Sequence, residues 1–141
     1  MIRYLTLPLF AALVMAAACV PYYQQGQGIP GDENAPPDFI AEGRASFMAD
    51  EMQGMRTASG RIFNLRERVA AHPTLPFGTI VEVTNLRNNK KVEVEVIDRG
   101  PFVRGRIIDV SFQAAKELGF VESGTTEVRL RIVRMGTGKS N

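Results

Sequence analysis

The strongest constraint on the fold is a strict alternation of apolar and charged residues in short segments. Residues 91–96 read Lys-Val-Glu-Val-Glu-Val, which places the three valines on one face and the two glutamates on the other. Residues 127–132 repeat the pattern as Glu-Val-Arg-Leu-Arg-Ile. A period of two residues is typical of a half-buried β-strand. Both segments therefore predict strands with one face on a core and one face in water.

A third strand and a helix complete the local signals. Residues 79–84 are rich in Val, Ile and Thr, and Asn88 and Asn89 can adopt the positive φ of a tight turn, so a hairpin is expected here. Ser111 can cap a short helix, and Gly119 suits the left-handed residue that ends one.

Several short strands, one or two small helices and no βαβ alternation favour a compact β-barrel. The chain has 141 residues, which suits one domain with one core. We place this domain at residues 41–135 and a flexible tail at residues 136–141. The net charge of +2 shows no demand for an anionic partner, so we expect no binding to nucleic acid.

The N-terminus has the composition of an export signal. Residues 1–18 hold a short positive start and an apolar run that is short for a transmembrane helix, which needs about 20 residues. Cys19 follows and is the single cysteine of the chain. It is either the lipidated first residue of a bacterial lipoprotein, which we favour because lipidation explains its position, or an ordinary residue after the cleavage site.

Residues 19–40 are expected to be the lipidated N-terminus and a disordered linker, because they are rich in Gln, Gly and Pro and can bury little apolar surface. The lipoprotein interpretation predicts attachment to the membrane through Cys19. It places the protein in the cell envelope, at the outer membrane and facing the periplasm.

The only histidine, His72, and the distant Asp98 are the candidate chemical groups. His72 precedes Pro73, which favours an extended backbone, in a loop that leads to the strand of residues 79–84. Asp98 ends the strand that begins at Lys91 and lies on the face of its valines, and the following Arg-Gly-Pro breaks the strand. A partly desolvated carboxyl group tends to have a raised pKa and can act as a general acid.

Each of these residues also has a structural interpretation. Asp98 can cap a turn, since Asp is a favoured turn residue, and His72 can be a packed loop histidine. Asp109 can be a buried carboxylate that braces the start of the helix, which we favour over catalysis. Only the combination of His72 with Asp98 favours a functional site.

Seven short motifs follow one another along the chain. They are Gly-Arg-Ala-Ser-Phe at 43–47, Thr-Ala-Ser-Gly at 57–60, Ala-Ala-His at 70–72, Leu-Pro-Phe-Gly-Thr at 75–79, Val-Thr-Asn-Leu at 83–86, Asp-Arg-Gly-Pro-Phe at 98–102 and Arg-Ile-Ile-Asp-Val-Ser at 106–111. In this order and with this spacing, they resemble the rare lipoprotein A family. The resemblance implies a mainly β fold, a six-stranded double-psi β-barrel with one or two short helices.

The resemblance also implies an activity. Active members are lytic transglycosylases that cleave peptidoglycan strands stripped of stem peptides, leaving 1,6-anhydro-muramic acid ends, in cell-wall remodelling or daughter-cell separation. It implies Asp98 as the catalytic acid, His72 as its partner and Asp109 as a secondary site residue. In this reaction Asp98 protonates the glycosidic oxygen and then takes the proton of the attacking 6-hydroxyl group, so no water need be activated.

Two positions depart from the family pattern. Arg61 stands where members usually have Glu, and a cation there can lower the pKa of Asp98 and keep it ionised. Phe47 and Met48 replace an aromatic pair, commonly Trp-Tyr, that suits stacking on sugars. We count Phe47, Arg61 and Arg99 with Asp109 as secondary or substrate-binding residues.

These departures favour the alternative of a catalytically inactive lipoprotein that binds glycan or serves an envelope structure. A metal enzyme is disfavoured, because one His and one Cys leave few ligands for zinc. We expect no cofactor, no metal, peptidoglycan glycan strands as the partner, and a monomer.

Overall fold

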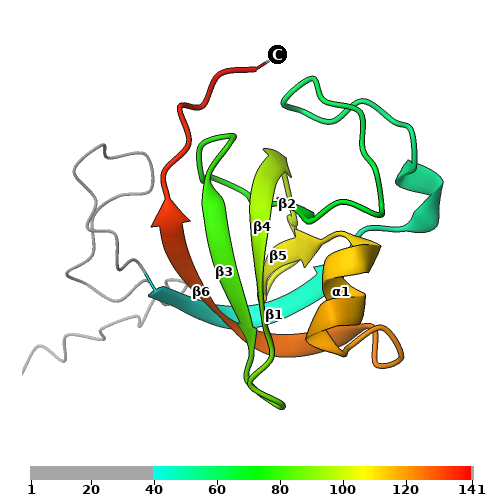
Figure 1. Ribbon diagram of the computed structural model, residues 1–141, viewed down its shortest axis with the longest axis vertical. Helices are drawn as coiled ribbons and strands as arrows, with labels where there is room; N and C mark the ends of the chain where they lie inside the picture. The colour runs from blue at the N-terminus through cyan, green and yellow to red at the C-terminus, as the bar shows by residue number, and fades with distance from the viewer. Residues whose placement is uncertain (1–39, 141) are drawn as a thin grey trace, which may run out of the picture.

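The computed structural model describes residues 40–140, which form a closed six-stranded barrel (Figure 1). The predicted signal segment, Cys19 and nearly all of the predicted linker lie outside the described residues. The elements in chain order are β1 (Ile40–Phe47), η1 (Asp50–Met52), β2 (Val69–Ala71), β3 (Ile80–Asn85), β4 (Lys91–Asp98), β5 (Arg106–Val110), α1 (Phe112–Leu118) and β6 (Thr125–Arg134).

The barrel closes in the order β1-β5-β2-β4-β3-β6, and two of its strand pairs are parallel. β1 runs parallel to β5 and β2 runs parallel to β4, while the other neighbours are antiparallel. The six-stranded barrel that the motifs implied is therefore confirmed. Because β2 and β4 are parallel, the segments that follow them leave the barrel at the same rim.

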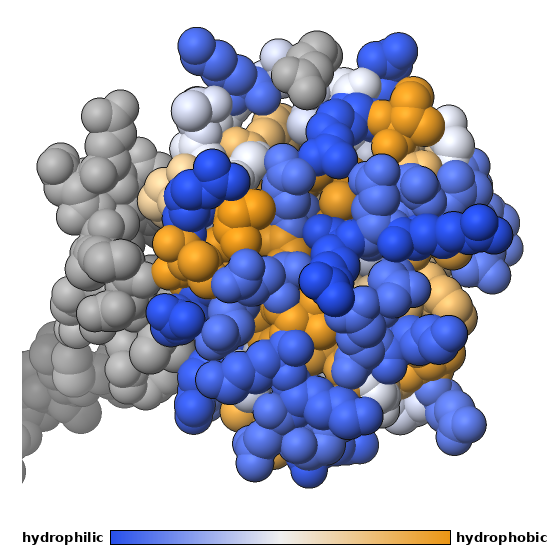
Figure 2. All heavy atoms as spheres, in the orientation of Figure 1, coloured by the Kyte–Doolittle hydropathy of each residue, from blue (hydrophilic) through white to orange (hydrophobic). Residues whose placement is uncertain are grey.

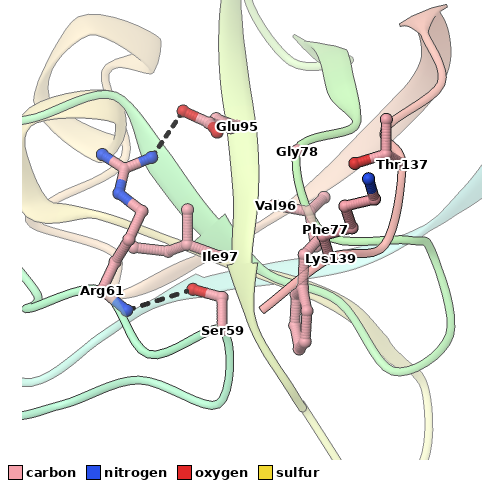
Figure 3. A pocket seen from close by; sticks show the side chains of 9 residues that line it. All are labelled: Ser59, Arg61, Phe77, Gly78, Glu95, Val96, Ile97, Thr137 and Lys139. Carbon is pink, nitrogen blue, oxygen red and sulfur yellow. Dashed lines mark hydrogen bonds and ion pairs between the residues drawn. The ribbon is translucent and has the colours of Figure 1, made fainter. Parts of the chain in front are cut away.

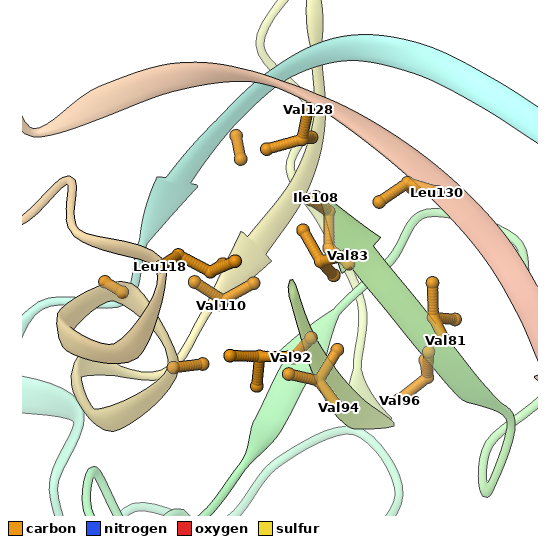
Figure 4. Close-up of a cluster of buried hydrophobic side chains, with 14 of the residues drawn as sticks. Val81, Val83, Val92, Val94, Val96, Ile108, Val110, Leu118, Val128 and Leu130 are labelled. Carbon is orange, nitrogen blue, oxygen red and sulfur yellow. The ribbon is translucent and has the colours of Figure 1, made fainter. Parts of the chain in front are cut away.

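The predicted alternation fills the barrel interior. Val92, Val94 and Val96 of β4 are at most 6% exposed and lie in one core cluster with Val128 and Leu130 of β6 (Figure 4). Their charged neighbours on β4 and β6 face outward. Figure 2 shows hydrophilic and hydrophobic side chains intermixed on one face of the molecule. The core interpretation of both alternating segments is confirmed.

The predicted turn and helix signals are also confirmed. Asn89 has a φ of 59° in the turn between β3 and β4. The Ser111 side chain caps α1 by accepting a hydrogen bond from the Ala114 amide at 3.3 Å. Gly119 ends the helix with a φ of 76°, in the left-handed region that favours glycine.

The connection from residue 48 to residue 68 covers part of the barrel with a second apolar cluster. This cluster contains Met48, Phe63, Val69, Ala71 and Ile97. Apart from η1, the connection has little regular structure and arches beside the ends of β2 and β4 (Figure 1). Its packing holds a loop against the end of β4, where the candidate site lies.

The segment after β6 returns to the barrel. The Gly136 amide donates to Thr79 Oγ1 at 3.0 Å, and the Gly138 amide donates to the Phe77 carbonyl at 3.1 Å. A Cβ at Gly136 would lie 2.1 Å from the Phe77 carbonyl oxygen, so only glycine permits this approach. Residues 136–138, in the segment predicted as a flexible tail, thus contact the barrel. No helix within residues 40–140 is long and apolar enough to cross a membrane.

Candidate active site

The parallel strands β2 and β4 bring His72 and Asp98 side by side. Asp98 is the last residue of β4, and His72 directly follows β2. The His72 amide donates to the Asp98 carbonyl oxygen at 3.1 Å. Although 26 positions separate them in the sequence, the two predicted residues are backbone neighbours at one rim of the barrel. Within residues 40–140, however, no hydrogen bond joins their side chains.

The Asp98 side chain does not continue the row of core valines as the alternation predicted. β2 and β4 shift register between Ala70 and Ala71, so Asp98 pairs with Ala71, and Ala71 packs in the second cluster. Ile97, the residue that precedes Asp98, is also buried in that cluster. The bulge therefore turns the Asp98 carboxylate towards the loop that covers the barrel.

The two oxygens of the Asp98 carboxylate have different environments. Oδ1 accepts hydrogen bonds from the backbone amides of Ala58 and Arg99, each at 2.9 Å. Oδ2 has no hydrogen-bond partner in the part of the chain that the structure describes. Because Oδ1 already accepts two hydrogen bonds, the protonated form of this carboxyl group carries its hydrogen on Oδ2. The group is therefore fixed in orientation and has one oxygen available for proton transfer.

The Ala58 amide reaches Asp98 because the turn of residues 57–60 is tied to β4. The Ser59 amide donates to the Ile97 carbonyl at 3.1 Å, and the Gly60 amide donates to the Thr57 carbonyl at 2.9 Å. Gly60 has a φ of 88°. The sequence alone does not indicate what this Thr-Ala-Ser-Gly motif does. The structure shows that its role is to present a backbone amide to the candidate acid.

The His72 ring is held by backbone amides of its own loop. Nδ1 accepts from the amides of Thr74 at 3.2 Å and Leu75 at 3.1 Å. The side chain is nearly buried, at 7% exposure. Burial, and then the charge of Arg99, lower the pKa of His72 to about 4. At neutral pH the ring is therefore uncharged with its hydrogen on Nε2, so it can donate a hydrogen bond from that atom.

Arg99 braces the loop that carries His72. Its Nη1 donates to the carbonyl oxygens of His72 at 3.2 Å and Leu75 at 2.8 Å. Its guanidinium carbon lies 3.8 Å from the centre of the Phe77 ring, a cation–π contact. The predicted substrate-binding residue Arg99 is thus a positioning residue that fixes the His72 loop next to Asp98.

Arg61 is engaged by carboxylates other than Asp98. Its Nη1 donates to Glu95 Oε2 at 2.7 Å, and its Nη2 donates to Glu67 Oε2 at 3.1 Å. Arg99, which follows Asp98 in the sequence, does interact with the charge of Asp98. Glu67 and Glu95 therefore compensate the charge of Arg61.

A cavity of about 280 Å³ adjoins β4 directly before Asp98. Figure 3 shows Arg61 and Glu95 on one side and Thr137 and Lys139 on the other. The complete lining consists of Ser59, Arg61, Phe77, Gly78, Glu95, Val96, Ile97, Thr137 and Lys139. Within residues 40–140, no group of three or more His, Cys, Asp or Glu side chains is arranged to hold a metal ion.

Asp109 lies across β2 from Asp98, and each of its two oxygens has a hydrogen-bond partner. It pairs with Ala71 across β2 and β5, in line with Asp98 on the other side of β2. Ser46 Oγ donates to its Oδ1 at 2.6 Å, and Arg106 Nη2 donates to its Oδ2 at 2.6 Å. The expectation that Asp109 braces the helix start is wrong, because its partners lie on β1 and β5 and Ser111 caps the helix.

Phe47 is not placed to stack on a ligand. Its ring meets Phe112 edge to face at 6.1 Å and Phe120 at 6.0 Å between centroids. It is partly buried against the core cluster. The predicted substrate-binding residue Phe47 therefore packs α1 and the segment after it onto β1.

Comparison with known proteins agrees with the motifs. The family described as "Lytic transglycolase" matches residues 40–130. The "Probable endolytic peptidoglycan transglycosylase RlpA" of Aquifex aeolicus is 48% identical over 100 residues, which are 71% of this chain and 44% of that protein. The "Endolytic peptidoglycan transglycosylase RlpA" of Pasteurella multocida is 48% identical over 97 residues, 69% of this chain and 33% of that protein. The chain thus spans less than half of the length of these relatives.

Solved structures share the fold. The "Streptomyces papain inhibitor (SPI)" matches with a TM-score of 0.58 and 24% identity, covering 70% of this chain and 98% of the inhibitor. The apo expansin of Clavibacter michiganensis matches with a TM-score of 0.54 and 23% identity, covering 71% of this chain and 53% of the expansin. The family match, the relatives and the barrel topology lead to one conclusion: the chain belongs to the RlpA-like, double-psi β-barrel family of lytic transglycolases.

Proposed function

We propose that this protein is an endolytic peptidoglycan transglycosylase whose acid and base is Asp98. The observation that carries the proposal is the asymmetric Asp98 carboxylate, with Oδ1 held by two backbone amides and Oδ2 free, next to an uncharged His72. The names of the relatives support a peptidoglycan substrate for the family.

The reaction needs one carboxyl group in two protonation states. Protonated Asp98 donates its Oδ2 hydrogen to the glycosidic oxygen as the bond to C1 of muramic acid breaks. The 6-hydroxyl oxygen of the same sugar then bonds to C1, and its proton passes to Asp98 Oδ2. The products are a free 4-hydroxyl end and a 1,6-anhydro-muramic acid end, and Asp98 is regenerated. Because the sugar supplies the nucleophile, a second catalytic carboxylate is not needed.

His72 serves this reaction as a hydrogen-bond donor. Its Nδ1 is occupied by two amides, so the ring cannot pick up a proton there without breaking both hydrogen bonds. The Nε2 hydrogen is available for the substrate or the free oxygen of Asp98. His72 therefore orients the reacting groups rather than exchanging protons with them.

The preferred substrate and the location of the protein are parts of the same proposal. We infer that the substrate is the glycan strand without stem peptides, processed during cell-wall remodelling or daughter-cell separation. The lipoprotein signal at Cys19 supports an outer-membrane anchor facing the periplasm, which would hold the barrel near peptidoglycan.

The test is to incubate the purified protein with denuded glycan strands and identify the products by mass spectrometry. Products with 1,6-anhydro-muramic acid ends that disappear with Asp98→Asn are expected. Intact strands that still co-sediment with the wild-type protein would instead support a catalytically inactive glycan-binding lipoprotein.

A further inference from the structure

Phe102 is the one aromatic side chain that residues 40–140 expose to solvent. This part of the chain contains no Trp or Tyr, and Phe102 is 83% exposed. The other phenylalanines are buried or partly buried, namely Phe47, Phe63, Phe77, Phe112 and Phe120. An aromatic ring left in water is informative because burial of such a ring is strongly favourable.

The exposed ring is connected directly to the candidate acid. Phe102 lies four residues after Asp98, in the loop between β4 and β5. Gly100 and Pro101 between them are buried, so the start of the loop is packed against the protein. A Cβ at Gly100 would lie 3.8 Å from Cε2 of Phe102, which shows that the ring lies close to this anchored backbone. Val103, at 56% exposure, extends the apolar surface.

The same loop carries a cation without a partner. Arg104 is exposed and has no hydrogen bond or ion pair in the part of the chain that the structure describes. By contrast, Arg99 and Arg106 at the two ends of the loop contact backbone carbonyls and Asp109. An exposed ring four residues past the acid and a free guanidinium six residues past it suit a ligand that has both an apolar face and a negative charge.

We propose that the loop of residues 99–105 is a glycan-binding platform, in which Phe102 stacks on a sugar ring and Arg104 pairs with the lactyl carboxylate of muramic acid. This inference rests on the proposed function. It also gives a physical reason for preferring stripped strands, because the lactyl carboxylate is free only when no stem peptide is joined to it through an amide bond.

Binding should be measured in the Asp98→Asn background, where the strands stay intact. Phe102→Ala is expected to raise the Kd for denuded strands about tenfold, and Phe102→Trp is expected to restore tight binding. Val133→Ala is the matched control, because it removes an exposed apolar side chain from β6 and should not change the Kd. Equal thermal unfolding midpoints for these variants show that the fold is unchanged.

Arg104→Gln tests the charge separately. It is expected to raise the Kd for denuded strands about threefold at low salt, and to leave the Kd for oligomers of N-acetylglucosamine, which lack the carboxylate, unchanged. Phe102→Ala should weaken both ligands. Unchanged affinity in Phe102→Ala and Arg104→Gln, with strand cleavage by the wild-type protein that depends on Asp98, overturns the platform alone. If the wild-type protein neither cleaves nor binds the strands, that result contradicts the proposed function itself.

Discussion

Asp98 and Asp109 are two carboxylates of the same barrel with opposite surroundings. They lie on either side of β2, each paired in register with Ala71. Asp109 has a hydroxyl group on one oxygen and a guanidinium on the other, both at 2.6 Å. Asp98 has two backbone amides on one oxygen and nothing on the other among residues 40–140.

The difference shows how similar positions acquire different chemistry. Side-chain partners from two directions engage both oxygens of Asp109. Backbone amides from one direction orient Asp98 and leave its second oxygen open. A position near the barrel rim therefore does not by itself make a carboxylate a candidate acid. The distribution of hydrogen-bond donors over its two oxygens distinguishes Asp98 from Asp109.

The largest expected effect separates these two residues by activity. Asp98→Asn should lower kcat for cleavage of denuded strands by about 10³-fold, because an amide cannot donate and recover the proton. The amide oxygen of Asn can still accept from Ala58 and Arg99, so the unfolding midpoint should change little. The readout is the rate at which anhydro-muramic ends appear.

Asp109→Asn is the matched variant for this comparison, since it makes the same chemical change across β2. It should keep most of the activity. Loss of activity in Asp109→Asn to the level of Asp98→Asn would show that both carboxylates take part and would break the comparison.

The next effect concerns the titration of His72, the backbone neighbour of Asp98, and its influence on the free energy of unfolding. Its pKa is lowered from 6.5 to about 4 in the folded protein, so the unfolded chain binds more protons between these values. The contribution of His72 to stability is complete above about pH 6.5 and falls as the pH is lowered towards 4. The expected loss in the free energy of unfolding is about 3 kcal/mol. Urea unfolding at several pH values measures it.

His72→Asn provides the control for this pH dependence. The amide oxygen of Asn can accept from Thr74 and Leu75 in place of Nδ1, but it does not titrate. The variant should therefore lack this part of the pH dependence. Parallel curves for the two proteins from pH 7 to pH 4 would show that His72 is not the group responsible.

The sequence predicted the parts of this site that depend on local patterns. Alternation located the valines of β4, and the motif positions located His72 and Asp98. The register shift between Ala70 and Ala71 was not predictable, because the second consecutive apolar residue at the end of the alternation, Ile97, does not show how β4 pairs with β2. The sequence likewise does not show that Phe112 and Phe120 lie against the ring of Phe47, a packing that the expected stacking on sugar leaves out.

A smaller effect is expected when Asp109 is changed, and it concerns the stability of the fold. Arg106 Nε is buried without a hydrogen-bond partner among the described residues, so Arg106 depends on its ion pair with Asp109. Asp109→Asn should lower the free energy of unfolding by about 2 kcal/mol, because a partly buried guanidinium loses its counter-charge. Ser46→Ala, which keeps the ion pair, should cost less. Equal losses in the two variants would show that the ion pair adds nothing to the hydroxyl contact.

The smallest effect is expected at Arg61, whose charge was expected to act on Asp98. A cation free to act on Asp98 would keep that acid ionised, but Arg61 is paired with Glu67 and Glu95. These side chains are about one third or more exposed, so the pairs should contribute less than about 1 kcal/mol to stability. Arg61→Gln should accordingly leave kcat within about twofold, a change of roughly 0.4 kcal/mol in the barrier.

The control is Arg61→Lys, which keeps the charge but not the two-pronged geometry of the guanidinium. If Arg61 suppresses Asp98 through its charge, Arg61→Gln raises kcat near neutral pH and Arg61→Lys does not. If the two neighbouring carboxylates already compensate the charge, neither variant changes the pH profile of cleavage. The second result would mean that the asymmetry of donors around Asp98, rather than the sign of the charge at residue 61, decides whether this carboxyl group can act as the acid.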